Sequence, residues 1–329
     1  MRIIYLIKSL LLIIVLLPGS LMGHGFDPAV LNIMETPDKS YMIHWQSRNV
    51  AEFSESSDLK KLHIIWPQDC ASDIQEDNSD YFLLSCISSL EGKIITISGL
   101  SWNKTDAMIS VRYLDGTQFS TVLTQGEESL TLPLKIATNN QGKPFFFFGI
   151  SHILQGYDHL LFILLLVLMF SGLKSQIKAL TAFTLGHSMS LSLATLGIFS
   201  LPPSSVEVLI AFTIFYTAYK TAKSSPINSS SYKLYFLPAF FGFIHGFGFA
   251  AALSEYLNLK DSIFVPLLSF NLGIESGQIL VISSLFILTK VLFNAGFNNI
   301  IFNRLVRQST TYFGGSLAVF WMISRLNIY

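Results

Sequence analysis

The chain has 329 residues, of which 51% are hydrophobic and only 13% are charged. An average soluble domain carries about 25% charged residues, so this composition excludes an ordinary soluble enzyme, a disordered chain and a coiled coil. Lysine plus arginine and aspartate plus glutamate both number 21. The resulting net charge of zero gives no general attraction to nucleic acid. Two cysteines are too few for a disulfide-rich scaffold or a four-thiolate zinc site.

The first segment, residues 1–23, predicts a signal peptide. Arg2 and Lys8 precede or interrupt an apolar run at residues 10–17, and small residues follow up to Gly23. This order is typical of a secretory signal, and the run is too short to span a bilayer comfortably. An uncleaved anchor is the alternative. Cleavage near Gly23 would make His24 the new N-terminus, and its α-amine and imidazole motivate the hypothesis of an outer metal site.

The second segment, residues 24–140, predicts an exported all-β domain. Short β-branched and aromatic stretches are separated by turn residues, a spacing typical of an antiparallel sandwich. Cys70 and Cys86 both lie in this segment, and an oxidising compartment favours a disulfide between them over two buried free thiols. The predicted strands are residues 41–46, 62–66, 81–86, 93–98, 107–113, 119–123 and 130–134.

The third segment, residues 145–329, predicts a polytopic α-helical membrane domain with about six transmembrane helices. Most of its apolar stretches approach or exceed the ~20 residues that a bilayer core requires. With the β domain exported, eight Lys and Arg residues fall on the inner side and three on the outer side, in agreement with the positive-inside rule. We therefore expect a plasma (inner) membrane protein with cytoplasmic basic loops. The predicted spans are residues 145–172, 177–198, 206–222, 234–256, 262–292 and 311–326.

Polar residues inside these spans carry the functional argument. Four of the seven histidines lie there together with acidic residues. An ionisable group near the bilayer centre costs several kcal/mol unless it is paired or hydrated, so such residues indicate a site or a pathway. The candidate metal ligands are His152, Asp158, His159, His187, His245 and Glu275, and the supporting polar residues are Asn271, Gln278 and Ser188.

Helical spacing predicts that these residues converge. His152 and His159 are seven residues apart and share a helix face, as do Asn271, Glu275 and Gln278. His187, His245 and Glu275 each lie about 15–20 Å into their spans at 1.5 Å per residue. Imidazoles with carboxylates suit nickel, cobalt, zinc or copper, and a proton relay is the alternative.

Glycines accompany two of the candidate ligands. The pairs Gly242/Gly246 and Gly273/Gly277 have the spacing that lets membrane helices approach closely. Helix packing alone is the simpler interpretation of these pairs. Glu207 follows two prolines and two serines, and this pattern predicts a capping box at a helix start.

Several motifs together resemble the HupE/UreJ family of membrane proteins, in its long form with an exported N-terminal domain. They include GISHILQGYDHLLF at residues 149–162, TAFTLGHS at 181–188, GFIHGFGFA at 242–250 and FNLGIESGQ at 270–278. The resemblance implies nickel or cobalt uptake. It also implies that His152, Asp158 and His159 form the family's proposed metal-handling element.

Three functions remain open at this point. A metal-ion permease for nickel, cobalt or zinc is favoured over an enzyme. An intramembrane zinc hydrolase is the alternative, with three histidines on the metal and Glu275 or Asp158 as the base. The third is a receptor or assembly factor whose exported domain binds a periplasmic protein. The chain has no nucleotide-binding loop, so we do not expect direct ATP coupling.

Overall fold

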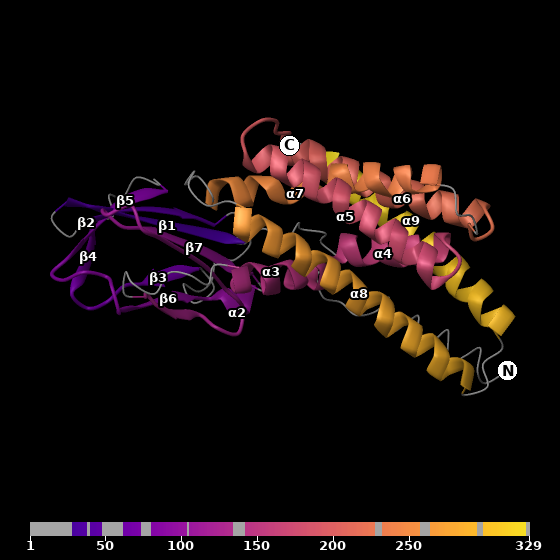
Figure 1. The fold of residues 1–329 in the computed structure, drawn as a ribbon, viewed down its shortest axis with the longest axis horizontal. Helices are drawn as coiled ribbons and strands as arrows, with labels where there is room; N and C mark the ends of the chain where they lie inside the picture. Colours follow the sequence, from indigo (N-terminus) through magenta and orange to yellow (C-terminus); the bar gives the residue numbers. More distant parts are fainter. Residues whose placement is uncertain are drawn as a thin grey trace.

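The computed structural model describes residues 28–37, 40–47, 62–73, 80–103, 105–133, 142–227, 232–256, 264–294 and 299–326. A β-rich part lies at one end of the long axis and a helical part at the other (Figure 1). The predicted signal peptide and His24 lie outside the described residues.

The β-rich part contains all seven predicted strands, with ends that differ by a few residues, and two further strands in the described chain that the sequence analysis did not identify. The two additional strands are β1 and β4. The strands are β1 (Ala29–Thr36), β2 (Ser40–Gln46), β3 (His63–Ile65), β4 (Cys70–Asp73), β5 (Tyr81–Cys86), β6 (Ile94–Ser98), β7 (Ala107–Arg112), β8 (Gln118–Leu123) and β9 (Ser129–Thr131), and a short helix, α2 (Leu100–Asn103), follows β6.

These strands form two sheets around one core. The larger sheet has the order β4-β5-β2-β1-β7-β8, and the smaller has the order β3-β6-β9. Leu31 and Ile109 from the larger sheet and Ile97 from the smaller are fully buried in this core. The predicted antiparallel arrangement is wrong at one place, because β1 pairs with β7 in parallel and makes the larger sheet mixed. Spacing along the chain predicts neighbouring hairpins, whereas β1 and β7 come from distant segments.

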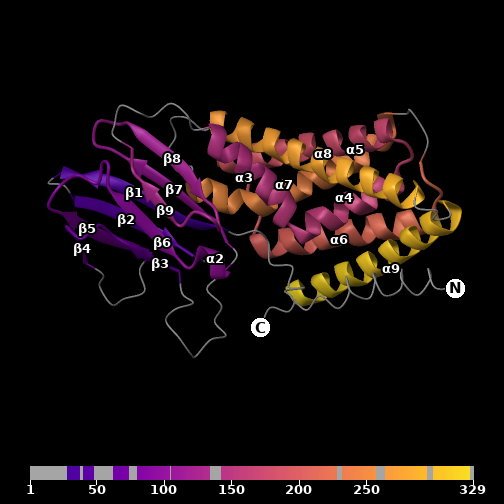
Figure 2. The ribbon, with the colours of Figure 1, turned by 90° about the horizontal axis from the view of Figure 1, so that it is seen from below.

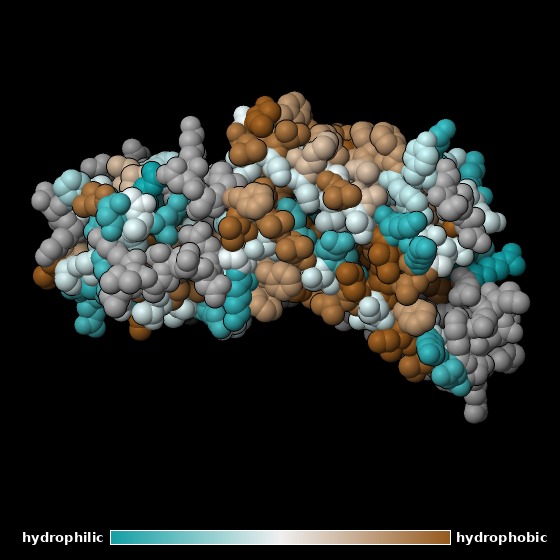
Figure 3. Space-filling view, in the orientation of Figure 1, coloured by the Kyte–Doolittle hydropathy of each residue, from teal (hydrophilic) through white to brown (hydrophobic). Residues whose placement is uncertain are grey.

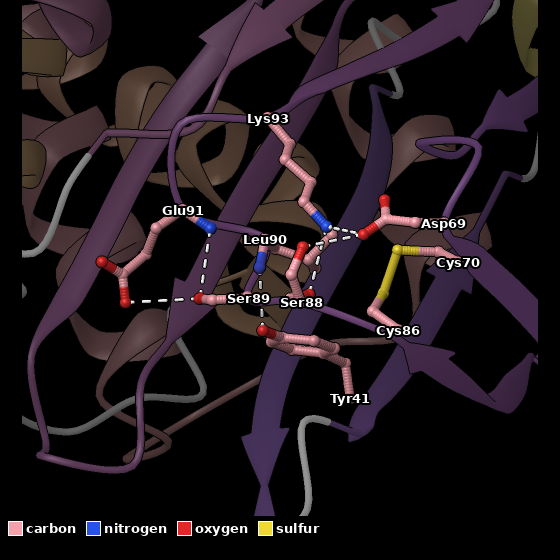
Figure 4. The surroundings of a disulfide bond; sticks show 9 residues. All are labelled: Tyr41, Asp69, Cys70, Cys86, Ser88, Ser89, Leu90, Glu91 and Lys93. Carbon is pink, nitrogen blue, oxygen red and sulfur yellow. Dashed lines mark hydrogen bonds and ion pairs between the residues drawn. A yellow bond between two sulfur atoms is a disulfide. The ribbon is translucent and has the colours of Figure 1, made fainter.

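The predicted disulfide is confirmed. Cys70 and Cys86 are directly opposite each other on β4 and β5 and are joined by an S–S bond. Beside it, the Asp69 carboxylate accepts hydrogen bonds from the Lys93 ammonium and, at 2.8 Å, from the Ser88 hydroxyl (Figure 4). The hydrogen bond from Lys93 is the main cause that lowers the pKa of Asp69. The bridge therefore ties an edge strand, together with the turn before it, to the rest of the sheet.

Removing this bridge is expected to destabilise the β-rich part. Cys70 and Cys86 are 16 residues apart, and closing a loop of about that length stabilises a fold by about 3 kcal/mol through the unfolded chain. The Cys70→Ala/Cys86→Ala variant of the full chain should unfold at a lower temperature in calorimetry. A reducing agent should lower the unfolding temperature of the original chain and leave the variant unaffected. Equal unfolding temperatures for the two proteins would contradict the prediction.

The helical part contains helices at every predicted span. The first predicted span, residues 145–172, is longer than a bilayer requires, and a sharp bend divides it into two helices. The described helices of this part are α3 (Gly142–Gln155), α4 (Tyr157–Met169), α5 (Leu173–Thr195), α6 (Pro203–Lys223), α7 (Phe236–Tyr256), α8 (Phe264–Asn294) and α9 (Asn299–Leu326), with a short 3-10 turn, η3 (Tyr232–Tyr235), before α7.

One described helix is by itself long and apolar enough to cross a bilayer, namely α8 over Phe264–Val291. The pair α3 and α4 passes the same test together, with a bend of 73° between them. The remaining described helices do not pass it singly, so six transmembrane helices stay a prediction. Polar and small residues on α5, such as Thr184, Gly186 and Ser190, explain part of this result, because they face neighbouring helices and lower the mean hydropathy.

The surface of the helical part is strongly apolar in the view of Figure 3, whereas the β-rich part is more hydrophilic. Large hydrophobic side chains are exposed on several helices, an arrangement that marks a surface for contact with lipid or protein. They include Leu185, Met189, Phe212, Phe240, Leu280, Phe286, Ile287 and Phe320.

Helices α6 and α9 lie side by side, with α9 along the edge of the helical part (Figure 2). Glu207 near the start of α6 meets Arg325 near the end of α9: its carboxylate lies 3.4 Å from Arg325 Nε, and its carbonyl accepts a 2.8 Å hydrogen bond from Nη1. The predicted capping box is wrong, because α6 begins at Pro203 without a side-chain cap. Glu207 instead connects two helix ends.

The β-rich part packs directly on the helices. Val30 and Met108 belong to the same buried core as the phenylalanines of the helical part. Next to them, the fully buried Asp106 accepts hydrogen bonds from the backbone N–H of Gln125 at 3.2 Å and from the Ser151 hydroxyl on α3 at 3.4 Å. The end of α3 is therefore held against the β-rich part.

This contact is expected to depend on pH. Burial raises the pKa of Asp106 to about 6, above the value of about 4 in an unfolded chain. The folded state therefore binds this proton more tightly, so the stability it contributes is present below about pH 4 and is lost as pH rises through about 6. The loss amounts to up to about 3 kcal/mol. Asp106→Asn should remove this pH dependence, because the amide does not titrate while its oxygen can accept from Gln125 and its nitrogen can donate to the Ser151 hydroxyl.

Calorimetry of the full chain at acidic and alkaline pH checks this prediction. The asparagine variant should unfold at a higher temperature than the original chain above pH 6, and the difference should shrink on acidification. An unchanged pH dependence in the variant would contradict the assignment to Asp106.

Candidate metal centre

The centre begins at the break between α3 and α4. Gly156 separates the two helices in an extended conformation, and its N–H still donates to the His152 carbonyl at 3.1 Å. On a continuous helix, residues seven apart would be displaced by about 10 Å along the axis. The bend instead brings the rings of His152 and His159 to 4.7 Å between centroids. The predicted pairing of these histidines is thus achieved by a helix break and not by a shared helix face.

A third histidine approaches from α5. The ring of His187 lies 6.1 Å from that of His152 and 6.2 Å from that of His159. One ring nitrogen from each of the three lies within 4.8 Å of the others, and all three residues are buried. Both ring nitrogens of His187 lack a hydrogen-bond partner in the described part of the chain. Buried polar atoms without partners are rare and call for an explanation, such as an ion that binds between them.

Asp158 acts on His159 and not on the centre directly. One of its carboxylate oxygens accepts a 2.8 Å hydrogen bond from the His159 backbone N–H and lies 2.9 Å from His159 Nδ1. A carboxylate in this position accepts the proton of Nδ1, so Nε2 is the nitrogen with a free lone pair. His159 Nε2 is buried and has no partner among the described residues. Asp158 therefore orients the His159 ring, whereas it was expected among the candidate ligands themselves.

Loss of this orienting carboxylate is expected to weaken metal binding without abolishing it. Removing a partner of this kind typically costs 10–100-fold in metal affinity. Asp158→Asn should therefore bind Ni²⁺ about 10–100-fold more weakly in calorimetric titration, with the stoichiometry of the original chain. A complete loss of binding would instead make Asp158 a ligand, and an unchanged affinity would exclude both roles.

The fourth histidine lies at the edge of the group. The ring of His245, on α7, is 5.3 Å from that of His159, but its Nε2 lies 2.7 Å from the Thr213 hydroxyl on α6. Its Nδ1 is buried and unpartnered in the described residues. Sequence reasoning missed Thr213, since a single threonine in an apolar helix carries no signal of its own. His245 is thus held beside the other three, with one nitrogen available.

Glycines bring the ligand-bearing helices together. A Cβ atom at Gly242 on α7 would overlap the Phe183 carbonyl on α5, and one at Gly246 would overlap the His187 carbonyl. Between α3 and α8, a Cβ at Gly273 would overlap the Phe146 carbonyl. The predicted close approach of these helices is confirmed. It places His187 and His245, on adjacent helices, at the same level.

Apolar rings surround the histidines. His152 lies 4.9 Å from Phe249 and 5.5 Å from Phe270 between ring centroids. His245 lies 5.2 Å from Phe162. These phenylalanines are almost fully buried, so imidazole nitrogens are the main polar groups that a cation would meet here. Electrostatic interactions are stronger in such surroundings than in water.

The remaining candidates lie elsewhere. Glu275 and Gln278 on α8 contact threonines of α5 and are not part of the three-histidine group. Asn271 donates to the Leu267 carbonyl of its own helix at 2.9 Å. Ser188 donates to the Thr184 carbonyl at 2.7 Å, so its hydroxyl serves its own helix. The predicted single site is therefore divided into a histidine centre and a separate polar stripe on α8.

The comparison with protein families decides the membership of this chain. Residues 128–325 match the family described as HupE / UreJ protein, a range that includes every histidine of the centre. The chain belongs to the HupE/UreJ family. HupE/UreJ proteins are membrane proteins linked to metal transport. No curated protein and no solved structure matches the chain.

Proposed function

We propose that this HupE/UreJ protein is a membrane permease for a divalent transition metal of the nickel and cobalt type. The observation that supports this function best is the buried group of His152, His159 and His187, whose ligand atoms lie within 4.8 Å of one another. Buried imidazole nitrogens this close together suit first-row transition metals as ligands. The family, which is linked to metal transport, favours the same conclusion.

The proposal includes a topology. The helical part crosses the plasma membrane about six times, and the β-rich part is exported after cleavage of residues 1–23. The disulfide supports export, since such bonds persist in oxidising compartments. The excess of Lys and Arg on the opposite side of the predicted spans supports cytoplasmic basic loops. In this arrangement the β-rich part covers the outer side of the centre, because it contacts α3 and α7, which carry His152 and His245.

A zinc hydrolase is less well supported. Such an enzyme needs a carboxylate base beside an open metal position. Asp158 is already bonded to His159, and Glu275 bonds to Thr181 at 3.1 Å. Among the described residues, no carboxylate belongs to the group of converging ligand atoms. A receptor role for the exported part would leave the buried histidines without a purpose.

Metal retention and uptake together test the permease. A transporter must bind its ion weakly enough to release it. The purified full chain should retain little metal after dialysis and should bind added Ni²⁺, Co²⁺ or Zn²⁺. Vesicles that contain it should accumulate the ion, and vesicles with the His152→Ala/His187→Ala variant should not. Stoichiometric metal that survives dialysis would overturn the proposal in favour of a fixed centre, as would equal uptake by both proteins.

A further inference from the structure

The polar stripe on α8 is a second site that the histidine centre does not use, with Gln278 buried and Asn271 and Glu275 half-buried. Asn271, Glu275 and Gln278 are spaced four and three residues apart, so they occupy one face of the helix. On the facing helix α5, the Thr181 hydroxyl donates to Glu275 Oε1 at 3.1 Å, and the Thr184 hydroxyl donates to Gln278 Oε1 at 3.0 Å. The stripe therefore joins α8 to the helix that also carries a histidine of the metal centre.

Two atoms of this stripe lack partners in the described part of the chain. Asn271 Oδ1 and Gln278 Nε2 are both buried and make no hydrogen bond. Because Gln278 is only 1% exposed, bulk water does not reach its amide either. Leaving such a group unsatisfied costs about 1–3 kcal/mol. One of the two atoms is an acceptor and the other is a donor. They flank Glu275 on the same face, one helical turn before it and one after it.

Glu275 can satisfy each of these atoms in a different protonation state. An ionised carboxylate only accepts hydrogen bonds, whereas a protonated carboxyl group also donates one. Side chains three or four residues apart on a helix are neighbours. Ionised Glu275 can therefore accept from the Gln278 amide in addition to Thr181. Protonated Glu275 can donate its O–H to Asn271 Oδ1. Each state satisfies one of the two unpartnered atoms.

We propose that Glu275 is a proton-binding site, flanked by Asn271 and Gln278, that couples proton movement to metal transport. This inference rests on the proposed permease function. A proton passes from water to a carboxylate oxygen of Glu275, whose new O–H bond is stabilised by Asn271. On release the proton returns to water, and the carboxylate is stabilised by Gln278 and Thr181. No metal ion binds at this site.

The donor set favours a proton over a metal cation. The unpartnered atom of Gln278 is an amide nitrogen, which only donates hydrogen bonds. Its positive hydrogens would repel a bound cation, and a cation offers no lone pair for them. Among the described residues, Glu275 makes no ion pair, so protonation removes a charge that is balanced only by hydrogen bonds. The other titratable groups on α8 and the helices packed against it are Lys143 and His152 on α3, Tyr157, Asp158 and His159 on α4, Lys174, Lys178 and His187 on α5, and Lys290 on α8 itself.

Helix α5 provides the physical connection between the two sites. Thr184 bonds to the stripe, and His187, three residues later, belongs to the metal group. Because both are fixed on one helix, a displacement of α5 on metal binding changes the contacts of Thr181 and Thr184 with α8. The two ions can thus influence each other without sharing a ligand.

Infrared titration of the full chain in detergent, without metal, tests proton binding directly. The other acidic residues also give carboxyl signals as pH falls, so the spectra of Glu275→Gln are subtracted from those of the original chain. The difference should contain one carboxyl band, that of Glu275, which appears as pH falls. Asn271→Leu removes the acceptor for the protonated form, so the midpoint should move to lower pH. Gln278→Leu removes a donor to the ionised form, so the midpoint should move to higher pH. We expect about one pH unit in each case, the equivalent of one hydrogen bond.

Opposite displacements in these two variants would support the site, and a merely structural role would not produce them. Identical midpoints, displacements in one direction, or no difference in the carboxyl signal between the original chain and Glu275→Gln would overturn it. Ser276→Ala is the matched control, since its hydroxyl donates only to the Leu272 carbonyl of the same helix; it should titrate as the original chain does.

Transport in vesicles tests the coupling. Glu275→Gln should bind Ni²⁺ with unchanged affinity and exchange it across the membrane at equal pH, but should lose accumulation driven by a pH gradient by at least about tenfold. Loss of Ni²⁺ binding would make Glu275 a metal ligand and overturn the inference, as would undiminished gradient-driven uptake. If the original chain moves no metal at all, the permease function fails, whereas the infrared result still decides whether the proton site exists.

Discussion

Replacing His187 by alanine is expected to lower the affinity of the full chain for Ni²⁺ by about 100-fold or more. This residue supplies one of three ligand atoms that lie within 4.8 Å of one another. Loss of a group that only orients a ligand already costs 10–100-fold, so loss of a ligand must cost at least as much. Calorimetric titration of the protein in detergent measures the change, and Co²⁺ and Zn²⁺ should respond in the same way.

The exposed histidine of the β-rich part, His63, is the matched control. His63→Ala removes an imidazole from the surface and should leave the affinity of the buried centre unchanged. An equal loss of binding in both variants would indicate surface binding of the metal, and an unchanged affinity in His187→Ala would show that the three histidines do not form a metal centre.

Adding one methyl group at Gly242 is expected to disrupt the helical part. The new Cβ would overlap the backbone carbonyl of Phe183 on α5, and a backbone carbonyl cannot rotate away as a side chain can. Overpacking of this kind costs about 1–3 kcal/mol and sometimes more. Gly242→Ala should therefore lower the unfolding temperature and weaken metal binding, because α5 and α7 carry His187 and His245. Thermal unfolding and Ni²⁺ titration of the same preparation measure both effects.

Gly315 on α9 offers a control with the same substitution. A Cβ at this position would meet the Ala218 side chain at 3.6 Å, which is an ordinary van der Waals distance. Gly315→Ala should keep the unfolding temperature and the metal affinity. If both variants unfold alike, the close approach of α5 and α7 does not limit stability, and the glycine pair has another role.

These two predictions describe different contributions to one centre. Imidazole nitrogens provide the chemistry, whereas glycines and the break at Gly156 provide the positions. Gly156 itself shows how closely these are connected, because a Cβ there would lie 2.9 Å from both the His152 carbonyl oxygen and His159 Nδ1. Gly156 therefore both allows the helix to break and leaves room for the His159 ring.

The sequence allowed much of the candidate site to be predicted. The histidines of the predicted spans stood out because ionisable residues are costly among apolar side chains, and three of them converge in the structure. The disulfide followed from two cysteines in a segment with export signals, and it is present. Seven strands followed from β-branched and aromatic stretches separated by turn residues. β1 was missed although Leu31 and Ile33, two residues apart, both belong to the buried core of the β-rich part.

Other assignments required knowledge of what lies across each helix. Spacing along α8 placed Glu275 and Gln278 on one face, but spacing cannot tell which neighbour that face meets; the structure shows that it meets Thr181 and Thr184. Likewise, the pattern His-x5-Asp-His is compatible with a straight helix, and only the bend of 73° brings its two histidines together.

The sequence by itself determined the composition of the two parts, the family, the disulfide and the identity of the buried histidines, since each depends on residue type or local order. Only the tertiary structure decided that β1 pairs with β7 in parallel, that Asp158 orients His159, and that the polar stripe of α8 is not part of the three-histidine group. These depend on contacts between segments far apart in the chain. Where helices meet, these contacts depend on which backbones can approach closely, as they do at Gly242 and Gly273. The residues of one helix do not identify the neighbour that its glycines will contact.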